Sequence, residues 1–208
     1  QILPTQMVGE GNSPYASPCA FGGEPLLISP EDLLQDRLLT LEELQTATLQ
    51  FENLQPEQVN YPAARKIKHQ LYLQAYQKFT TDHPLRDTYQ EFLTKSGHWL
   101  SLLATYCASK DGNPLEYHLF LQFIFHHQFA RWRDYLHSLG ISLIGDLPLF
   151  LAADGVEATY RPALFKRGSD GAFQVQCGVP PDLFSQDGQC WSTPNYNWRE
   201  MELAGFDW

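Results

Sequence analysis

The amino-acid sequence predicts an α/β fold, and two observations support this prediction. Apolar residues at helical spacing run from Leu115 to Leu139, and Gly140 stands where a left-handed C-cap is expected. The apolar run Ile141–Ile144 follows at once and predicts a strand that ends just before Asp146. A helix, one glycine, a strand and a polar residue at the strand end form the pattern of an α/β unit. In α/β barrels such strand ends carry the active site, so Asp146 is a functional candidate.

The composition indicates a folded globular chain. Of the 208 residues, 43% are hydrophobic and 13% aromatic, which suffices to bury a core in one domain or in two small ones. A net charge of −10 opposes nucleic-acid binding, which needs clustered Lys and Arg. We find neither a secretory signal nor an apolar run near the roughly 20 residues of a membrane helix. The four cysteines form no CxxC pair, which fits a reducing cytosol and predicts a cytoplasmic protein.

Residues 1–28 predict a long loop. Ile2–Pro4 has the character of the end of a buried strand, and repeated glycines and prolines interrupt everything after it. A loop of this length in a compact domain is usually functional. It combines polar side chains such as Ser13 and Tyr15 with apolar anchors such as Phe21. A packed surface loop is the alternative interpretation.

The following segment predicts helices. Ser29 before Pro30, and Thr40 before Glu43, are N-cap patterns. A longer helix is expected over 62–79, because four of its apolar residues recur every four positions on one face: Ile67, Leu71, Ala75 and Phe79.

Two further helical stretches come before the expected strand. Asp82–Pro84 restarts a helix that Ser96–Gly97 is expected to end, and the apolar run Trp99–Tyr106 fits either a strand or a helix start. The helix that begins at Leu115 has an expected core stripe of Leu119, Phe123, Trp132, Leu136 and Leu139.

The seven histidines predict no metal site. His126 and His127 are adjacent, so on a helix they point about 100° apart and cannot easily share an ion. His118 lies too far along the same helix, and there is no HExxH motif. We therefore expect structural roles for them.

The segment after Val179 predicts a binding surface. Two prolines stiffen the chain before Asp182, and the polar turn that follows is flanked by Phe184, Gln189 and Trp191. Exposed aromatics on a rigid polar loop tend to mark a binding surface. Carboxylate, amide and aromatic side chains together suit a sugar, whose hydroxyls need polar partners and whose ring face needs an aromatic plate.

The carboxylates nearby have a structural alternative. Asp146 could instead cap the turn that follows it. Asp154 and Glu157 fit helix caps better than catalytic groups.

Four blocks of the sequence resemble the 4-α-glucanotransferase family, also called amylomaltase or disproportionating enzyme. The family carries Q-[IV]-LP, GDSPYxSxSAFAGNPxLI, IIGDLPIFVAxDSADVW and GVPPDYFSxxGQxWGNPxYNW. This chain has QILP at its start, GNSPYASPCAFGGEPLLI from Gly11, LIGDLPLFLAAD from Leu143 and GVPPDLFSQDGQCWSTPNYNW from Gly178. These blocks span the chain, and the last is long and unusual enough to make chance similarity unconvincing.

The resemblance implies a fold and an activity. The fold is a (β/α)8 barrel, of which this chain supplies about the first three strands, with a helical insertion around residues 29–97. The activity is transfer of α-1,4-glucan segments between maltooligosaccharides in the cytosol, without a metal or organic cofactor. The mechanism is retaining: a carboxylate nucleophile forms a glycosyl-enzyme, and a second carboxylic acid protonates the leaving oxygen and then activates the acceptor hydroxyl.

Carried over position by position, the resemblance assigns glucan contacts but no catalytic group. Asp146 matches the family's strand-end aspartate beside the donor sugar, and Ser13 and Tyr15 match the loop after the first strand. The matches to the family's glucan-contacting loop are Asp182, Phe184, Gln189 and Trp191. The nucleophile, acid/base and third essential aspartate lie in RIDHFRG, AEDLG and THDN blocks, and none of these occurs in residues 1–208.

Several positions depart from the family pattern. The family's GYG tyrosine is Glu10, an acidic position of WLDDYALF is Leu102, and the tryptophan of DSADVW is Thr159. The tyrosine of PPDYF is Leu183, and the asparagine of WGNP is Thr193. Each loss would weaken binding by roughly 1–3 kcal/mol where the side chain contacts substrate.

These observations leave several functional hypotheses open. The first is the N-terminal portion of a 4-α-glucanotransferase, inactive without its catalytic carboxylates and dependent on the remainder of the barrel as its partner. The alternatives are a non-catalytic glucan-binding module, a divergent or decayed homologue, and a glycoside hydrolase of the same clan. We also expect the isolated chain to aggregate, because an incomplete parallel sheet leaves an open edge and uncovered apolar faces.

Overall fold

The computed structural model describes residues 1–54 and 57–208, apart from the side chain of Glu10. The chain divides into two compact units, one formed by residues 1–22 with 143–208 and the other by residues 23–142. Within the described residues, no helix combines the length and the apolar character that crossing a bilayer requires.

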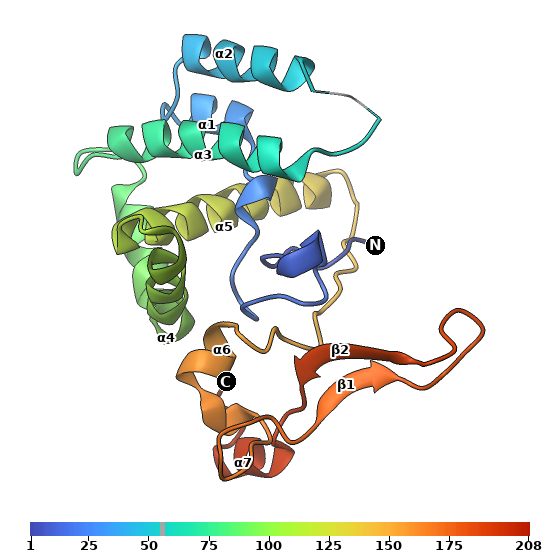
Figure 1. Cartoon of the computed structure of the whole chain (residues 1–208). Coiled ribbons are helices and arrows are strands. Elements are labelled where there is room, and N and C mark those ends of the chain that lie inside the picture. The colour runs from blue at the N-terminus through green and yellow to red at the C-terminus, as the bar shows by residue number, and fades with distance from the viewer. Residues whose placement is uncertain (55–56) are drawn as a thin grey trace. The chain divides into compact units, whose positions relative to one another are not determined.

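The unit of residues 23–142 is helical (Figure 1). Its elements are the 3-10 helix η2 (Pro25–Leu27) and the α-helices α1 (Pro30–Gln35), α2 (Leu41–Glu52), α3 (Tyr61–Lys78), α4 (Arg86–Asp111) and α5 (Leu115–Ser138). Helix α5 packs against both α3 and α4. An aromatic core forms where they meet, with Phe79 lying 5.1 Å from Phe120 and Tyr89 lying 5.3 Å from Phe123 between ring centroids.

The starts of α1 and α2 are the ones that local sequence predicts. Ser29 Oγ accepts a 3.1 Å hydrogen bond from Asp32 N and caps α1. Thr40 and Glu43 form a reciprocal capping box on α2. Both side chains satisfy backbone N–H groups that the first helical turn leaves without partners.

Helix α4 runs through Gly97, so the expected helix end at Ser96–Gly97 is wrong. Of the two interpretations of Trp99–Tyr106, the helix is the one found. A helical glycine costs about 1 kcal/mol relative to alanine, whereas each large buried apolar side chain stabilises by roughly 1.5–3 kcal/mol. The buried residues Trp99, Leu100 and Leu103 lie just beyond the glycine. Their burial outweighs the cost of Gly97.

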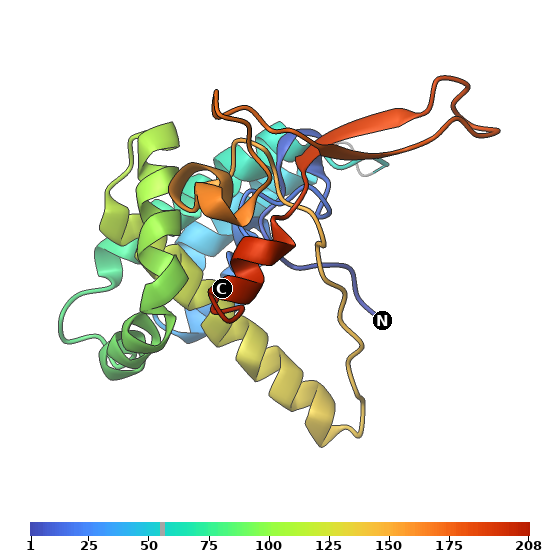
Figure 2. The same cartoon turned by 90° about the horizontal axis from the view of Figure 1, so that it is seen from below.

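Helix α5 confirms its predicted end but only part of its predicted core stripe. Gly140 adopts φ 75°, and Ile141 N donates to Leu136 O at 3.0 Å, which closes the helix as expected. Phe123 is buried, whereas Trp132 and Leu139 are exposed. The second half of α5 extends beyond the helices that pack on its first half (Figure 2). Periodicity marks an apolar face but does not say which turns receive a partner.

The unit of residues 1–22 and 143–208 contains short elements. These are η1 (Glu10–Asn12), α6 (Val156–Tyr160), η3 (Pro162–Leu164), β1 (Gln176–Val179), β2 (Gln189–Pro194) and α7 (Trp198–Leu203). Strands β1 and β2 form an antiparallel hairpin in which Val179 pairs with Gln189. A small core of Leu151, Ala158, Leu164, Phe165, Tyr196 and Met201 lies in this unit.

Neither Ile141–Ile144 nor Ile2–Pro4 is a strand, which corrects two expectations. The two segments touch through one backbone hydrogen bond, from Ile2 N to Ile144 O at 2.9 Å. The Ile144 side chain is 65% exposed. A strand exists only when a neighbour completes its hydrogen-bond ladder, and the two strands that the described residues do form are the antiparallel pair β1 and β2. The described residues thus form helices and one antiparallel hairpin, and the parallel pairing among them is the isolated bridge between Ser17 and Leu151.

Candidate functional site

The residues singled out as sugar contacts all lie in the unit of residues 1–22 and 143–208. Tyr15 and Asp146 come together, because Tyr15 Oη donates a 2.8 Å hydrogen bond to Asp146 Oδ2. Ser13 lies beside them, and its Oγ accepts a 3.3 Å hydrogen bond from Tyr15 N. Two of the matched sequence blocks therefore meet through these side chains.

Asp146 combines the two roles that its sequence position allowed. Its Oδ1 accepts a 2.8 Å hydrogen bond from Leu147 N, which shapes the following turn, while Oδ2 receives Tyr15. A carboxylate oxygen has two acceptor sites, so both oxygens keep capacity for a further donor. The hydrogen bond to Asp146 raises the pKa of Tyr15, since ionising the phenol would remove the donor and place two negative charges together. Tyr15 thus remains a neutral donor at physiological pH.

The backbone after Asp146 holds the Tyr15 loop in place. Ala152 N donates to Ser17 O at 2.9 Å, and Val156 N donates to Pro18 O at 2.7 Å. Gly155 approaches the loop so closely that a Cβ there would lie 2.5 Å from Pro18 O. A side chain at this position would push the two segments apart, because real Cβ contacts are longer.

Gln189 and Trp191 form a second group at the start of β2, next to the loop that connects the two strands. Trp191 Nε1 donates a 3.1 Å hydrogen bond to Gln189 Oε1, which leaves the Gln189 amide NH2 as a donor group. The Trp191 ring lies 6.2 Å from the ring of Phe150 and is 47% exposed. An exposed indole that packs against a second aromatic ring at a tilt of 50° is the kind of surface against which a pyranose face can pack.

Phe150, whose ring contacts Trp191, is a residue of the candidate site that the sequence did not predict. It lies four positions after Asp146 in the same block, LPLF. That proximity to a candidate carboxylate was the available signal.

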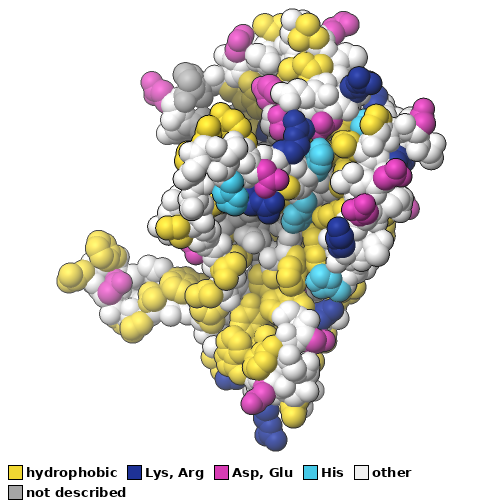
Figure 3. All heavy atoms as spheres, turned by 180° about the vertical axis from the view of Figure 1, so that it is seen from behind, with side chains coloured by type: hydrophobic (Ala, Val, Ile, Leu, Met, Phe, Trp, Pro, Cys, Tyr) yellow, Lys and Arg dark blue, Asp and Glu magenta, His cyan; other side chains and the backbone are white. Residues whose placement is uncertain are grey.

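Asp182 and Phe184 stand apart from both groups, in the loop between β1 and β2. Asp182 Oδ1 accepts hydrogen bonds from Phe184 N at 2.8 Å and from Ser185 N at 2.7 Å. This carboxylate therefore builds the turn that presents Phe184. Phe184 and Leu183 are 93% and 98% exposed, and hydrophobic side chains are visible at the projecting end of the hairpin (Figure 3).

The positions that depart from the family pattern have varied environments. The side chain of Glu10 lies outside the described residues. Leu102 is half-buried on α4, Leu183 is exposed, and Thr159 is exposed with its Oγ1 donating to Gly155 O at 2.8 Å. Thr193 is buried, and its Oγ1 has no hydrogen-bond partner among the described residues.

Glu157 is not a helix cap, which corrects a further expectation. Gly155 occupies the N-cap position of α6. The Glu157 side chain is buried instead, and its Oε1 accepts a 3.1 Å hydrogen bond from Ala20 N. Burial raises the pKa of this carboxyl.

The histidines of α5 are part of the helical packing. His126 lies 5.3 Å from Phe92 and 5.7 Å from Trp99 between ring centroids. Its burial lowers its pKa to about 4, so the ring is neutral. His118 contacts Asp111 at 3.1 Å. Across the residues that the structure describes, no three His, Cys, Asp or Glu side chains are placed to hold a metal ion.

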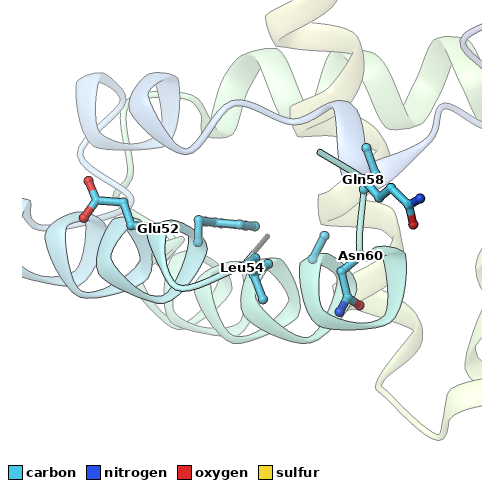
Figure 4. Close-up of a pocket in the computed structure, with 7 residues that line it drawn as sticks. Glu52, Leu54, Gln58 and Asn60 are labelled. Atoms are coloured by element: carbon cyan, nitrogen blue, oxygen red, sulfur yellow. The ribbon is translucent and has the colours of Figure 1, made fainter. Parts of the chain in front are cut away.

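A surface hollow in the helical unit contains none of the predicted sugar contacts. It measures about 310 Å³ and is lined by Phe51, Glu52, Leu54, Gln58, Val59, Asn60 and Ala64 (Figure 4). The Asn60 side chain is engaged as the N-cap of α3, accepting from Ala63 N at 3.1 Å. We assign this hollow no role.

Comparison with known proteins identifies relatives along the whole sequence. The family model described as 4-alpha-glucanotransferase matches residues 1–116 and 109–208. The 4-alpha-glucanotransferase of Aquifex aeolicus is 32% identical, covering 100% of this chain and 47% of the relative. The chloroplastic/amyloplastic 4-alpha-glucanotransferase of Solanum tuberosum is 30% identical, covering 100% of this chain and 41% of the relative.

Solved structures agree. The chain is similar to an amylomaltase from Streptococcus agalactiae in complex with acarbose, with a TM-score of 0.86 and 27% identity over 99% of this chain and 47% of that one. An amylomaltase from Corynebacterium glutamicum matches with a TM-score of 0.81 at 19% identity, over 98% of this chain and 32% of that one, which shows the fold alone. The chain spans about half the length, or less, of the relatives it matches.

Proposed function

The chain belongs to the 4-alpha-glucanotransferase family, and on that basis we propose that it forms the glucan-contacting part of an enzyme that transfers α-1,4-glucan segments between maltooligosaccharides. The observation that supports this most directly is the 2.8 Å hydrogen bond from Tyr15 to Asp146. It joins two matched blocks that are 131 residues apart in sequence. Both side chains keep hydrogen-bonding capacity for sugar hydroxyls.

In this proposal Asp146 and Tyr15 orient the donor sugar. The free acceptor sites of Asp146 take hydrogens from sugar hydroxyls, and the Tyr15 oxygen accepts one more. Trp191, supported by Phe150, packs against a ring face, and the Gln189 amide donates beside it. Ser13 holds the Tyr15 backbone and completes the polar rim.

The loop with Asp182 and Phe184 serves a different purpose. Asp182 fixes the turn by accepting from Phe184 N, and the Phe184 side chain is thereby held in solvent. We assign this loop to covering bound glucan. Excluding water there favours attack by an acceptor sugar over hydrolysis.

The chemistry would follow the retaining route. A carboxylate displaces the leaving sugar at the anomeric carbon while a carboxylic acid protonates the departing oxygen, and the acceptor hydroxyl then displaces the carboxylate and returns that proton. The blocks that carry these carboxylates in the family do not occur in residues 1–208. This chain therefore binds and orients, and the bond-breaking groups come from elsewhere.

We further propose that the chain is the first part of a (β/α)8 barrel. Ile2–Pro4 and Ile141–Ile144 would become strands beside the remainder of the barrel, and the helical insertion around 29–97 would lie outside it. In support, Ile144, Leu147 and Leu149 are all exposed here, and parallel barrel strands bury such side chains on both faces. All four cysteines are unpaired, which supports a reducing compartment such as the cytosol.

A non-catalytic glucan-binding module is the second candidate, favoured by aromatic and carboxylate groups without the catalytic blocks. Two assays separate the candidates. Titration with maltoheptaose, followed by tryptophan fluorescence, is expected to saturate under both. Glucose release from maltotriose is expected only after the purified chain is combined with the C-terminal half of a family member. Saturable binding without such complementation supports the module, and no binding at all overturns both.

A further inference from the structure

Glu157 is a buried carboxyl that none of the proposed sugar contacts uses. It lies in the first turn of α6 and is 3% exposed. Its Oε1 accepts from Ala20 N at 3.1 Å and lies 3.6 Å from Cys19 Sγ. Its Oε2 is buried without a hydrogen-bond partner among the described residues. Burial of a polar group is unfavourable unless hydrogen bonds compensate for the lost contact with water. A buried carboxyl with one unpartnered oxygen therefore indicates a specific role for its other oxygen.

The loop that Glu157 contacts is a compact turn. Ser17 and Cys19 are fully buried. Ser17 Oγ donates to Cys19 O at 2.7 Å and accepts from Cys19 N at 3.2 Å, so the turn satisfies these groups internally. The N–H of Ala20 points the other way, to Glu157. Glu157 thus accepts the hydrogen bond of the Ala20 N–H, the last backbone donor of this turn.

The same turn leads directly back to Tyr15. Its other attachments are the hydrogen bonds from Ala152 N to Ser17 O and from Val156 N to Pro18 O. In each of these hydrogen bonds one partner, Ala152, Val156 or Glu157, belongs to the segment that begins at Asp146. The attachments therefore set the position of the Tyr15 loop relative to Asp146.

We propose that Glu157 is a positioning residue that aligns Tyr15 with Asp146 by anchoring the backbone of Ala20. It does not touch substrate. The hydrogen bond to Ala20 N supports this role, because it joins α6 to a loop that is 137 residues away in sequence. A neighbouring charge, Arg161, favours the ionised form, and burial opposes it. Either form of the carboxyl keeps an oxygen to accept from Ala20 N.

The test uses the full 208-residue chain with Glu157→Leu, Glu157→Gln and the exposed control Glu202→Leu. Leucine fills the space but has no acceptor, whereas glutamine keeps one oxygen. We expect Glu157→Leu to weaken maltoheptaose binding about tenfold, to speed amide exchange at Ala20, and to return the Tyr15 pKa toward its ordinary value. The Tyr15 signal is isolated as the phenolate absorbance difference from the same variant carrying Tyr15→Phe. Glu157→Gln is expected to restore all three within about twofold.

This inference rests on the proposed function for its binding readout alone. If the native chain binds no maltoheptaose, the proposed function fails, while Ala20 exchange and the Tyr15 titration still decide the role of Glu157. A folded Glu157→Leu chain with native Ala20 exchange and a native Tyr15 titration overturns the inference. Should that variant not fold, Glu157→Asp replaces it: withdrawing the carboxylate by one methylene should shift the Tyr15 titration in the same direction, and an unchanged titration rejects the role.

Discussion

Tyr15 and Asp146 are joined by a 2.8 Å hydrogen bond between Oη and Oδ2, although neither lies on a helix or a strand. Both belong to loops whose backbones are tied together nearby, through Ser17 and Ala152. The pair is thus held by its surroundings and remains open to solvent. Such an arrangement suits ligand contact better than structural support.

Replacing Tyr15 by Phe removes the hydroxyl and keeps the ring. We expect the dissociation constant for maltoheptaose to rise about tenfold, because both Asp146 and the sugar lose a hydrogen-bond partner. The melting temperature should change little, because the pair is exposed. Tyr135→Phe, at an exposed tyrosine of the helical unit, is the matched control. Equal affinity of Tyr15→Phe and the native chain would remove Tyr15 from the site.

Trp191 is expected to report and strengthen glucan binding. Trp191→Ala should abolish most of the fluorescence change on titration and weaken binding about fivefold to tenfold, since the plate for the sugar ring is lost. Trp132→Ala provides the comparison, because that side chain is 42% exposed, close to the 47% of Trp191. Loss of binding in Trp132→Ala but not in Trp191→Ala would place the glucan elsewhere.

His126 should make the helical unit sensitive to acid. Burial lowers its pKa in the folded chain to about 4, whereas an unfolded histidine has its ordinary pKa near 6.5. The stabilising contribution is therefore complete above about pH 6.5 and is lost as pH falls from there to about 4, by on the order of 2–3 kcal/mol. Urea unfolding at a series of pH values measures this loss.

His126→Gln should flatten that dependence, because it removes the titrating ring. His137→Gln, at an exposed position in the last turn of α5, should leave the dependence unchanged. A native chain whose unfolding free energy does not fall between pH 6.5 and 4 contradicts the buried, neutral His126.

Two glycine-to-alanine substitutions should have opposite effects. Gly155→Ala places a Cβ 2.5 Å from Pro18 O, a backbone atom that cannot move aside alone. It should lower the melting temperature and weaken maltoheptaose binding together. Gly97→Ala meets nothing within 4 Å inside α4 and should stabilise by about 0.5–1 kcal/mol. Thermal unfolding compares the two, and a neutral Gly155→Ala would show that the loops do not need this close approach.

The apolar segment after Ile141 should drive self-association of the isolated chain. Leu147 and Leu149 are exposed, and lysine at both positions is expected to reduce aggregation, measured by light scattering, without lowering the melting temperature. Leu151→Lys, two residues on, should instead unfold its unit because that side chain is buried. A native chain that elutes and melts as a monomer contradicts this expectation.

The features that sequence predicted best are those determined within a few residues. The caps at Ser29 and Thr40 and the left-handed Gly140 depend on local backbone chemistry, and each is found. The pairing of Tyr15 with Asp146 was not predicted by periodicity. The resemblance assigned each residue separately to glucan contacts, and their hydrogen bond is found only in the structure.

The features that sequence missed depend on distant partners. Ile141–Ile144 has the composition of a strand, but it pairs with no other strand among the described residues. The helix continues through Gly97 because burial of Trp99 outweighs the free-energy cost of a helical glycine. Glu157 is a residue type that often caps helices. Only the structure shows that its side chain accepts a hydrogen bond from Ala20 N instead. No local pattern distinguishes a carboxylate that meets solvent from one that meets a backbone amide far away in the chain.

The unit that carries the proposed sugar contacts is assembled from two segments with residues 23–142 between them. Bringing Tyr15 to Asp146 therefore closes a loop of 131 residues, whose entropic penalty falls if the intervening chain is already compact. The helical unit is rich in local contacts, which form quickly. Folding of the insertion would thus shorten the search between its two ends, and we expect the helices to fold first and the sugar contacts last.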